Sequence, residues 1–399
     1  MFVPARRLRA WGLLVCAAAA AVVGFVAGGP GSVPVLSPPY VNPSPYPELA
    51  YHRAYNHGPA TSAASAILVE AKTGTILYAK NEHQLREPAS ITKVMTSLVA
   101  IERADLADVV SVSANAARVG GSSLYLKAGD VYKLEELIRA TMLRSGNDGA
   151  TAIAEHVGGS VSDFVSLMNT RAHSMGLKKT RFVNPHGLTA PGHYSTAYDI
   201  ALMCMVALAN PKFADIVSTA EHWASTIDDD RARVVYNTNR LLWSFAGADG
   251  IKTGTTSRAG HCLAASATRD GLQFIAVVLR SGARWHDAAV LLEYGFQNFT
   301  RVTLARRGEA VAEALVAHLR QPYAEIGPLR DVDIVLRKDE VEKVTTHVDV
   351  PARLRATVPC GRMAGHLRIF YDGEEVSSYP LYVFRSVSRR GVLGLTHGM

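Results

Sequence analysis

The segment Glu87-Pro88-Ala89-Ser90-Ile91-Thr92-Lys93 places a lysine three residues after a serine. Apolar residues continue at the i, i+4, i+7 spacing of a helix, at Val94, Leu98 and Ile101. This spacing predicts a helix over about residues 90–104, on which Ser90 and Lys93 share one face. A lysine can take the proton of a serine hydroxyl when desolvation or a second cation lowers its pKa. Read alone, however, the pair is also explained by an N-cap serine and a solvated lysine.

Two later segments supply further polar groups. Ser145-Gly146-Asn147 follows a predicted helix that ends at Arg144, and it offers a hydroxyl and an amide. By itself it is an ordinary polar turn. Lys252-Thr253-Gly254-Thr255 begins a predicted strand with apolar neighbours. Its glycine would let a substrate lie flat against the strand, and its lysine would attract a carboxylate.

The tetrapeptide Lys-Thr-Gly-Thr occurs twice in the chain. The first copy, at residues 72–75, separates two apolar runs, and its glycine favours the positive φ of a hairpin turn. The second copy lies among three short strands that we predict at 250–255, 259–268 and 272–279. It also follows the other two motifs in the order S-x-x-K, S-x-N, K-T-G, which is the signature of penicillin-binding proteins and serine β-lactamases.

Residues 60–385 resemble the low-molecular-mass penicillin-binding proteins that are serine-type D-alanyl-D-alanine carboxypeptidases, a peptidase S11-like family. Besides the three motifs, the likeness is carried by five segments, at residues 87–90, 184–188, 195–199, 239–242 and 249–254. The resemblance implies an α+β fold. A penicillin-binding or serine β-lactamase-like catalytic domain, built as an antiparallel sheet with helices, would precede a small, mostly β domain.

The resemblance also implies catalytic roles. Ser90 would be the acyl-ester nucleophile and Lys93 its proton acceptor. Ser145 would relay a proton to the leaving amine, and Asn147 would hold the acyl side-chain amide. The N–H groups of Ser90 and Thr255 would form the oxyanion hole.

Substrate binding is expected along the K-T-G strand, by Lys252, Thr253, Gly254, Thr255 and Arg284. For Arg284 a solvated position at the start of a helix remains an equal alternative. His186 is expected to be structural, in a loop near the site. The reaction needs no metal and no cofactor.

Three alternatives to a carboxypeptidase stay open. A β-lactamase of class A would carry a deacylating glutamate, but the acids between residues 161 and 202 are Asp163 and Asp199, and no E-x-x-L-N occurs there. A D,D-endopeptidase relative would lack the second domain. A non-catalytic wall-binding or antibiotic-sensing protein of this fold would not need a serine and lysine together.

The chain divides into five predicted parts. Residues 1–28 combine three arginines with an uncharged apolar run, which is typical of a signal peptide or of an uncleaved membrane anchor. Residues 29–60 are predicted to be a spacer, since seven of the 18 prolines lie between residues 30 and 47. A catalytic domain at 61–302 and a β domain at 303–386 follow. The tail, 387–399, contains three glycines and is a poor anchoring helix.

Composition restricts the class of protein further. With 48% hydrophobic and 19% charged residues, the 399-residue chain is not intrinsically disordered. Removing residues 1–28 takes three arginines from the net charge of +7 and leaves +4, so nucleic acid is not an expected partner. The expected partners are peptidoglycan stem peptides and β-lactam inhibitors, with membrane contact through the N-terminus. We therefore expect an exported protein of the cell envelope.

The cysteines do not form a metal-binding pattern. Cys204, Cys262 and Cys360 are far apart and odd in number in the exported part of the chain. Buried structural thiols are the simplest interpretation, and a disulfide between two of them stays open.

Overall fold

A computed structural model describes residues 49–51, 57–226, 233–317, 323–355, 357–385 and 387. Within these ranges the chain forms two compact units. The larger extends to Val302 and includes Ile334–Asp339, and the smaller comprises Thr303–Asp333 and the described residues from Glu340 onward. The predicted export segment 1–28 lies outside the described residues, as does the predicted tail except for Val387.

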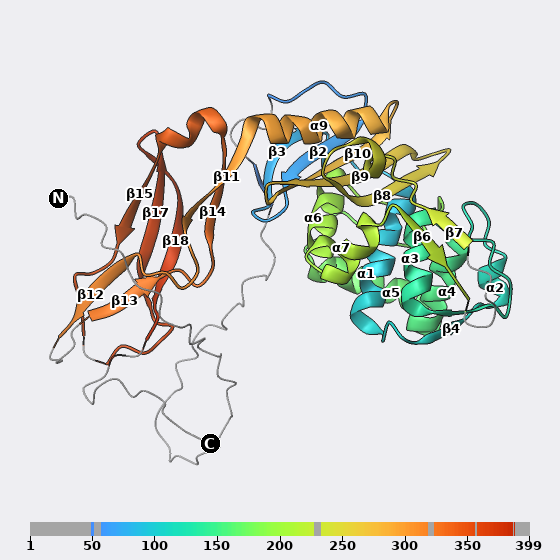
Figure 1. Cartoon of the computed structure of the whole chain (residues 1–399), viewed down its shortest axis with the longest axis horizontal. Coiled ribbons are helices and arrows are strands. Elements are labelled where there is room, and N and C mark those ends of the chain that lie inside the picture. Colours follow the sequence, from blue (N-terminus) through green and yellow to red (C-terminus); the bar gives the residue numbers. More distant parts are fainter. Residues whose placement is uncertain are drawn as a thin grey trace, which may run out of the picture. The chain divides into compact units, whose positions relative to one another are not determined.

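A six-stranded sheet forms the centre of the larger unit, in the order β1-β3-β2-β10-β9-β8 (Figure 1). Its pairs are antiparallel, apart from β1–β3. The strands are β1 Ala50–Tyr51, β2 Ser65–Glu70, β3 Thr75–Lys80, β8 Ala248–Thr256, β9 Gly260–Arg269 and β10 Leu272–Ser281. The three predicted strands are confirmed, and so is the hairpin turn at the first Lys-Thr-Gly. Ala50–Tyr51, in the predicted spacer, pairs with β3 beside the buried Leu49.

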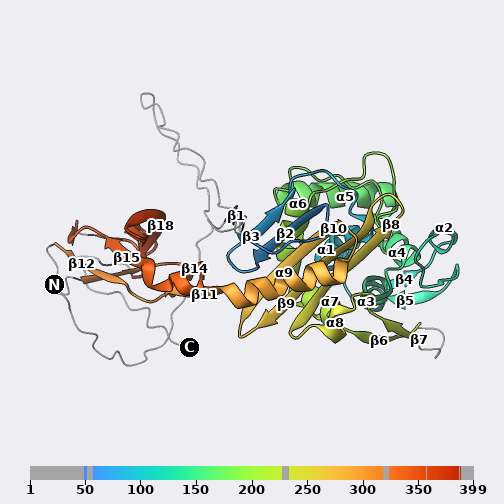
Figure 2. The same cartoon turned by 90° about the horizontal axis from the view of Figure 1, so that it is seen from above.

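Alternate side chains of this sheet enter two separate cores, as the pleat of a strand requires. Ile67 and Val277 belong to a core shared with helices α1 and α3 to α7, whereas Leu68 and Val278 belong to a core shared with α9. Figures 1 and 2 show α9 along one face of the sheet and α1 and α3 to α7 on the opposite face. The helices are α1 Lys93–Arg103, α2 Ala114–Ala117, α3 Leu134–Arg144, α4 Asn147–Gly158, α5 Val161–Ser174, α6 Ala197–Leu208, α7 Pro211–Ser218, α8 Leu241–Ser244 and α9 Arg284–Asn298.

The predicted helix over 90–104 begins differently from the expectation. Its first turn is a 3₁₀ helix, η1 (Ala89–Thr92), and the α-helix α1 starts only at Lys93. In a 3₁₀ turn, side chains three residues apart are nearly eclipsed. The tighter turn therefore brings residues 90 and 93 together more directly than an α-helical turn would.

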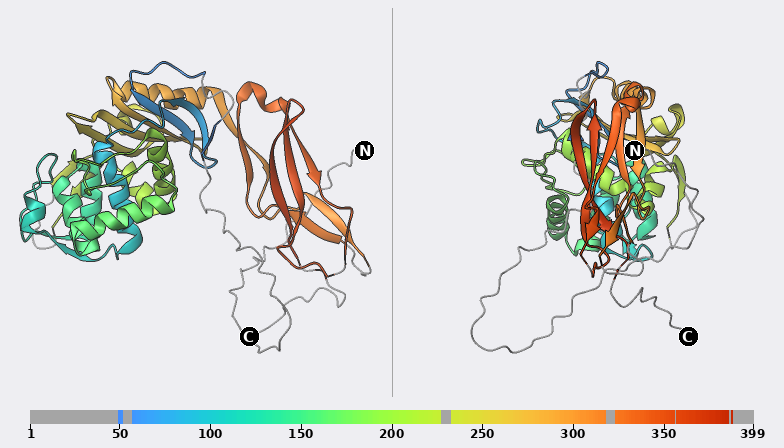
Figure 3. Two further views of the ribbon diagram at one scale, coloured as in Figure 1. Left: turned by 180° about the vertical axis from the view of Figure 1, so that it is seen from behind. Right: turned by 90° about the vertical axis from the view of Figure 1, so that its left-hand side faces the viewer.

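The smaller unit contains a second six-stranded sheet, in the order β15-β17-β18-β13-β12-β16. Its long hairpin turns at Asp372 and Gly373, which both have positive φ, as a tight hairpin demands, so the predicted turn is confirmed. Figure 3 shows these strands from two sides. Their bounds are β12 Ala312–Val316, β13 Tyr323–Gly327, β15 Val344–Asp349, β16 Arg353–Leu354, β17 Met363–Tyr371 and β18 Glu374–Val383.

The remaining strands form short pairs. They are β4 Val109–Ser111 with β5 Val131–Lys133, β6 Glu221–Ala224 with β7 Arg233–Tyr236, and β11 Phe299–Ala305 with β14 Val332–Arg337. A second 3₁₀ helix, η2, covers Lys338–Lys343.

Two general features concern the described residues only. No single helix among them is long and apolar enough to cross a membrane; α6 and α7 reach that length together, with a bend of 106° between them. Cys204 and Cys262 are buried free thiols, and Cys360 is half-buried.

Candidate active site

Ser90 sits on a strained turn that two glycines allow to pack closely. Ala89 is fully buried at a φ of 48°, in the left-handed region that costs energy for a residue with a Cβ. A Cβ on Gly254 would lie 2.9 Å from Pro88 O and 3.1 Å from Ser90 N. A Cβ on Gly187 would collide with Ala89 O. The serine turn thus packs closely between β8 and the loop at 184–188.

This contact gives Gly254 a steric role besides the expected one. The sequence suggested that its glycine leaves room for a substrate along the strand. In the structure the missing Cβ also leaves room for the backbone of the serine turn. Close approach of two backbones is the usual reason for a glycine inside a strand.

The amine of Lys93 lies at the centre of the site. Lys93 is fully buried, and its Nζ donates to Ser90 Oγ at 3.1 Å, to Asn147 Oδ1 at 2.7 Å and to the carbonyl of His186 at 2.8 Å. Burial lowers the pKa of Lys93 well below its ordinary value, and the positive charge of Lys252 lowers it further. A base with a lowered pKa, in hydrogen-bond reach of a hydroxyl, has the geometry of an activated nucleophile.

Ser145 and Asn147 occupy the junction between α3 and α4. Ser145 follows the last residue of α3 in the left-handed conformation, with φ 68°, and Asn147 is the first residue of α4. Asn147 Nδ2 donates to Gly120 O at 2.7 Å, which turns the amide oxygen toward Lys93. Within the described residues no hydrogen bond joins Ser145 Oγ to Lys93 or to Lys252, although Ser145 is buried.

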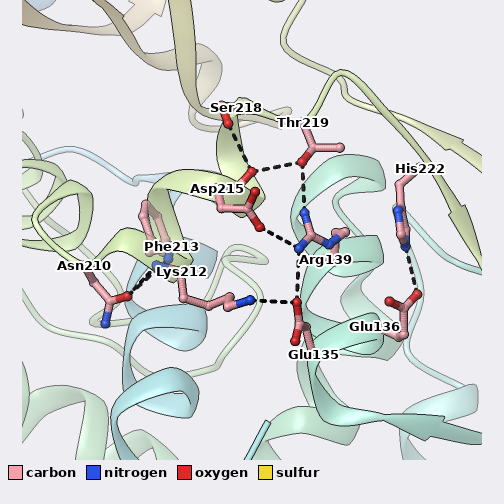
Figure 4. A network of polar contacts seen from close by, with 10 residues as sticks. All are labelled: Glu135, Glu136, Arg139, Asn210, Lys212, Phe213, Asp215, Ser218, Thr219 and His222. Atoms are coloured by element: carbon pink, nitrogen blue, oxygen red, sulfur yellow. Dashed lines mark hydrogen bonds and ion pairs between the residues drawn. The ribbon is translucent and has the colours of Figure 1, made fainter. Parts of the chain in front are cut away.

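A polar network holds α3, and with it Ser145, against α7 (Figure 4). Arg139 donates to Asp215 at 2.7 Å, to Glu135 at 3.1 Å and to Thr219 at 3.0 Å. Lys212 of α7 also donates to Glu135, at 3.0 Å. Because α7 packs against β8 in turn, the network relates α3 to the K-T-G strand.

The amine of Lys252 is buried at the K-T-G strand. The residue is 1% exposed, and its Nζ has no hydrogen-bond partner in the described part of the chain. Burial lowers the pKa of Lys252 to about 7, and the neighbouring Arg284 adds to the effect. An unpaired buried ammonium is costly, so an incoming carboxylate would be bound strongly here.

Arg284 is the first residue of α9, is half-buried, and lies against the same strand. Its Nη1 donates to Thr255 Oγ1 at 2.7 Å and to Gly254 O at 3.0 Å. Its guanidinium stacks over the ring of Trp285, 4.6 Å from the centroid. The adjacent Thr253 hydroxyl lies 2.7 Å from Thr238 Oγ1, so the strand is fixed on both sides of Gly254.

The structure adds groups that the motifs did not reveal. The sequence suggested only a structural His186, yet its backbone carbonyl is one of the three acceptors of Lys93. His186 is half-buried, and this burial lowers its pKa to about 3. Asp148 is also buried and accepts from Ser123 Oγ at 2.6 Å and from Leu124 N at 3.0 Å, which fixes the loop beside Asn147. The family resemblance includes the segment Asn184–Leu188. Because every residue has a backbone carbonyl, however, the sequence could not indicate that the carbonyl of His186 contacts Lys93.

Comparison with known proteins identifies the family. The model of the D-alanyl-D-alanine carboxypeptidase family, Peptidase_S11, matches residues 52–283, and that of the penicillin-binding protein 5 C-terminal domain matches residues 299–389. The chain belongs to the D-alanyl-D-alanine carboxypeptidase family. The predicted family, fold class and enzyme type, a serine hydrolase, are thereby confirmed.

Several members of this carboxypeptidase family are similar over most of the chain. D-alanyl-D-alanine carboxypeptidase DacF of Bacillus subtilis is 34% identical over 84% of this chain and 88% of its own length. DacD of Escherichia coli is 33% identical over 82% of this chain and 88% of its own. The structure of penicillin-binding protein 5 from Haemophilus influenzae matches with a TM-score of 0.74 and 30% identity, over 83% of this chain and 98% of that one.

A shorter relative covers less of the chain. The Streptomyces K15 DD-transpeptidase is 32% identical, with a TM-score of 0.58, over 60% of this chain and 98% of its own. The carboxypeptidase-family relatives with both parts therefore resemble this chain over more of its length.

Proposed function

We propose that the protein removes the terminal D-alanine from peptidoglycan stem pentapeptides through an acyl-enzyme on Ser90, and that penicillins acylate the same serine. The observation that carries this proposal is the position of Lys93, fully buried with its Nζ 3.1 Å from Ser90 Oγ. The family to which the chain belongs supplies the substrate class.

Acylation begins with attack of Ser90 Oγ on the carbonyl carbon between the two D-alanines, while Lys93 Nζ takes the hydroxyl proton. The N–H groups of Ser90 and Thr255 bind the oxyanion that forms. The carbon–nitrogen bond then breaks, and the leaving amine receives a proton through Ser145. Hydrolysis of the ester by water frees Ser90 and returns its proton.

The substrate is oriented by its terminal carboxylate. Lys252, with its unpaired ammonium, and the Thr255 hydroxyl held by Arg284 form the binding group for this charge. Asn147 would hold an amide of the stem peptide on the other side of Ser90. Because binding is tied to a free carboxylate, the arrangement favours removal of a C-terminal residue over cleavage within a chain.

Peptidoglycan lies outside the cytoplasmic membrane, so we also propose export, by the signal or anchor predicted at residues 1–28. The N-terminus would then provide the membrane contact of the protein. Secretion with and without residues 1–28 tests this part separately.

Release of D-alanine from a diacyl-Lys-D-Ala-D-Ala peptide tests the function. We expect release by the wild type, none by Ser90→Ala, and normal release by Ser166→Ala, which removes an exposed hydroxyl on α5. Undiminished release by Ser90→Ala would contradict the nucleophile assignment. Release that depends on an added acceptor amine would instead indicate transpeptidation.

A further inference from the structure

Three segments that carry site residues meet at one carboxylate, that of Glu87. Glu87 Oε2 accepts a hydrogen bond of 2.7 Å from Thr189 Oγ1, and Glu87 Oε1 lies 3.0 Å from Arg258 Nε. Glu87 precedes Ser90 by three residues, Thr189 follows His186 by three, and Arg258 follows Thr255 by three. The carboxylate therefore joins the serine turn, the loop that contacts Lys93, and the turn after the K-T-G strand.

A second contact joins Thr189 to the end of the K-T-G strand. Thr189 Oγ1 lies 3.2 Å from Thr256 Oγ1, which accepts from Ala259 N at 3.0 Å. We call Glu87, Thr189, Thr256 and Arg258 the clasp. The side chain of Glu87 is 13% exposed and that of Arg258 is 74% exposed, so the ion pair is weakened by water. The shorter link is the charged hydrogen bond between Glu87 and Thr189, whose acceptor carboxylate is mostly buried although Thr189 itself is exposed.

The loop held by the clasp, residues 184–189, is stabilised by hydrogen bonds between its own residues and to α1. Asn184 Oδ1 accepts from Gly187 N at 2.7 Å, and Asn184 Nδ2 donates to Leu188 O at 2.9 Å. Upstream, Pro185 O accepts from Thr96 Oγ1 of α1 at 2.5 Å. Downstream, the loop is joined to the serine segment through Thr189. Because these hydrogen bonds connect the two ends of the loop, we expect release of its downstream end to shift the His186 carbonyl relative to Lys93.

We propose that Glu87 is a positioning residue of this site. By holding Thr189 and Arg258, it keeps the 184–189 loop against the turn after β8, the His186 carbonyl on Lys93 Nζ, and water away from that amine. This inference rests on the proposed function only in so far as Lys93 acts as the base for acylation.

If Glu87 keeps water from Lys93, its loss changes the pH range in which Lys93 acts as a base. The charged groups that face Lys93 are Lys252 from β8 and Asp148 from α4, with His186 neutral because of its low pKa. Burial is the largest cause of the lowered pKa of Lys93. Water admitted by an open clasp would raise that pKa toward its ordinary value. Lys93 would then be protonated at neutral pH and recover as a base when the pH rises.

The test is the rate of acylation by a fluorescent penicillin between pH 6 and 10. We expect Glu87→Ala and Thr189→Val to react about tenfold more slowly than wild type at pH 7. Their acid limb should move up by about one pH unit or more, so that the deficit shrinks at high pH. Glu87→Gln, whose amide oxygen still accepts from Thr189, should lie between them and wild type.

Glu293→Ala is the matched control, because Glu293 pairs with Arg269 at 2.9 Å between α9 and β9, on the other face of the sheet. It should retain the wild-type profile. The proposal is overturned if both clasp variants keep the wild-type profile, or if they lose the same factor at every pH. If circular dichroism shows that Glu87→Ala does not fold, the profile of Thr189→Val alone tests the proposal.

Failure of the proposed function gives a different result. A wild type that is acylated by penicillin but releases no D-alanine would refute the carboxypeptidase reaction, and the comparison of clasp variants would still stand. A wild type that is not acylated would refute both.

Discussion

Lys93 and Asn147 are 54 residues apart in the sequence and meet through one hydrogen bond, 2.7 Å from Nζ to Oδ1. The same amide donates to Gly120 O, so its orientation is determined by the loop before it. The amine at the centre of the site is therefore held by three segments: its own helix, the start of α4 and the 184–188 loop.

The first prediction concerns this amide. Asn147→Ala removes an acceptor of Lys93 and the link to Gly120, and it should slow acylation by a fluorescent penicillin by about 10²-fold, the lower end for loss of positioned proton transfer. Asn147→Asp places a negative charge on Lys93, which raises its pKa, so its acid limb should move to higher pH. A Asn147→Asp profile at or below the wild-type limb would contradict the contact.

The second prediction follows from the pKa of Lys252, which burial lowers to about 7. Below that pH the free enzyme carries the ammonium that binds a carboxylate, and above it the charge is lost. KM for the D-Ala-D-Ala peptide should therefore rise between pH 7 and 9. Lys252→Arg keeps its charge over this range, so its KM should stay flat, whatever its absolute value. Equal pH dependence of KM in both proteins would count against Lys252 as the carboxylate site.

The third prediction tests the contact between β8 and the serine turn. In Gly254→Ala the new Cβ would meet Pro88 O and Ser90 N, which are backbone atoms that cannot swing aside. We expect a loss of about 1–3 kcal/mol in the free energy of unfolding and acylation slowed by at least about tenfold. Gly282→Ala is the control, since its Cβ would meet only Ser62, at 3.5 Å. Full activity of Gly254→Ala would show that the turn and strand can separate without consequence.

The fourth prediction concerns stability away from the site. Glu70 is fully buried, accepts from Thr73 N at 2.7 Å and pairs with Arg301 at 2.6 Å. Glu70→Ala leaves both donors without this acceptor, so the free energy of unfolding should fall by about 2–4 kcal/mol in urea titrations. Glu293→Ala, which breaks a more exposed pair, should cost about 1 kcal/mol or less. Similar losses in the two variants would mean that burial of Glu70 has little influence.

Much of the fold was predictable because its signals are local. The apolar runs at β2, β3, β8, β9 and β10 and the helical spacing after Ser90 are patterns within a few residues. The two copies of Lys-Thr-Gly-Thr show the limit of prediction from such local patterns. The first turns a hairpin beside Glu70, whereas the second lies inside β8 against the serine turn. The two tetrapeptides have the same sequence, and only the segments that pack around each of them give them different structures.

Sequence by itself determined the family, the fold class and the reactive pair, since Ser90 and Lys93 are joined by one turn of chain. Tertiary structure alone decided what surrounds that pair: the His186 carbonyl, the reason for Gly254, the contact of Arg284 with Thr255, and the clasp around Glu87. These contacts join segments far apart in the chain, and backbone atoms take part in several of them. Burial, which lowers the pKa values of Lys93 and Lys252, likewise exists only when those segments pack together.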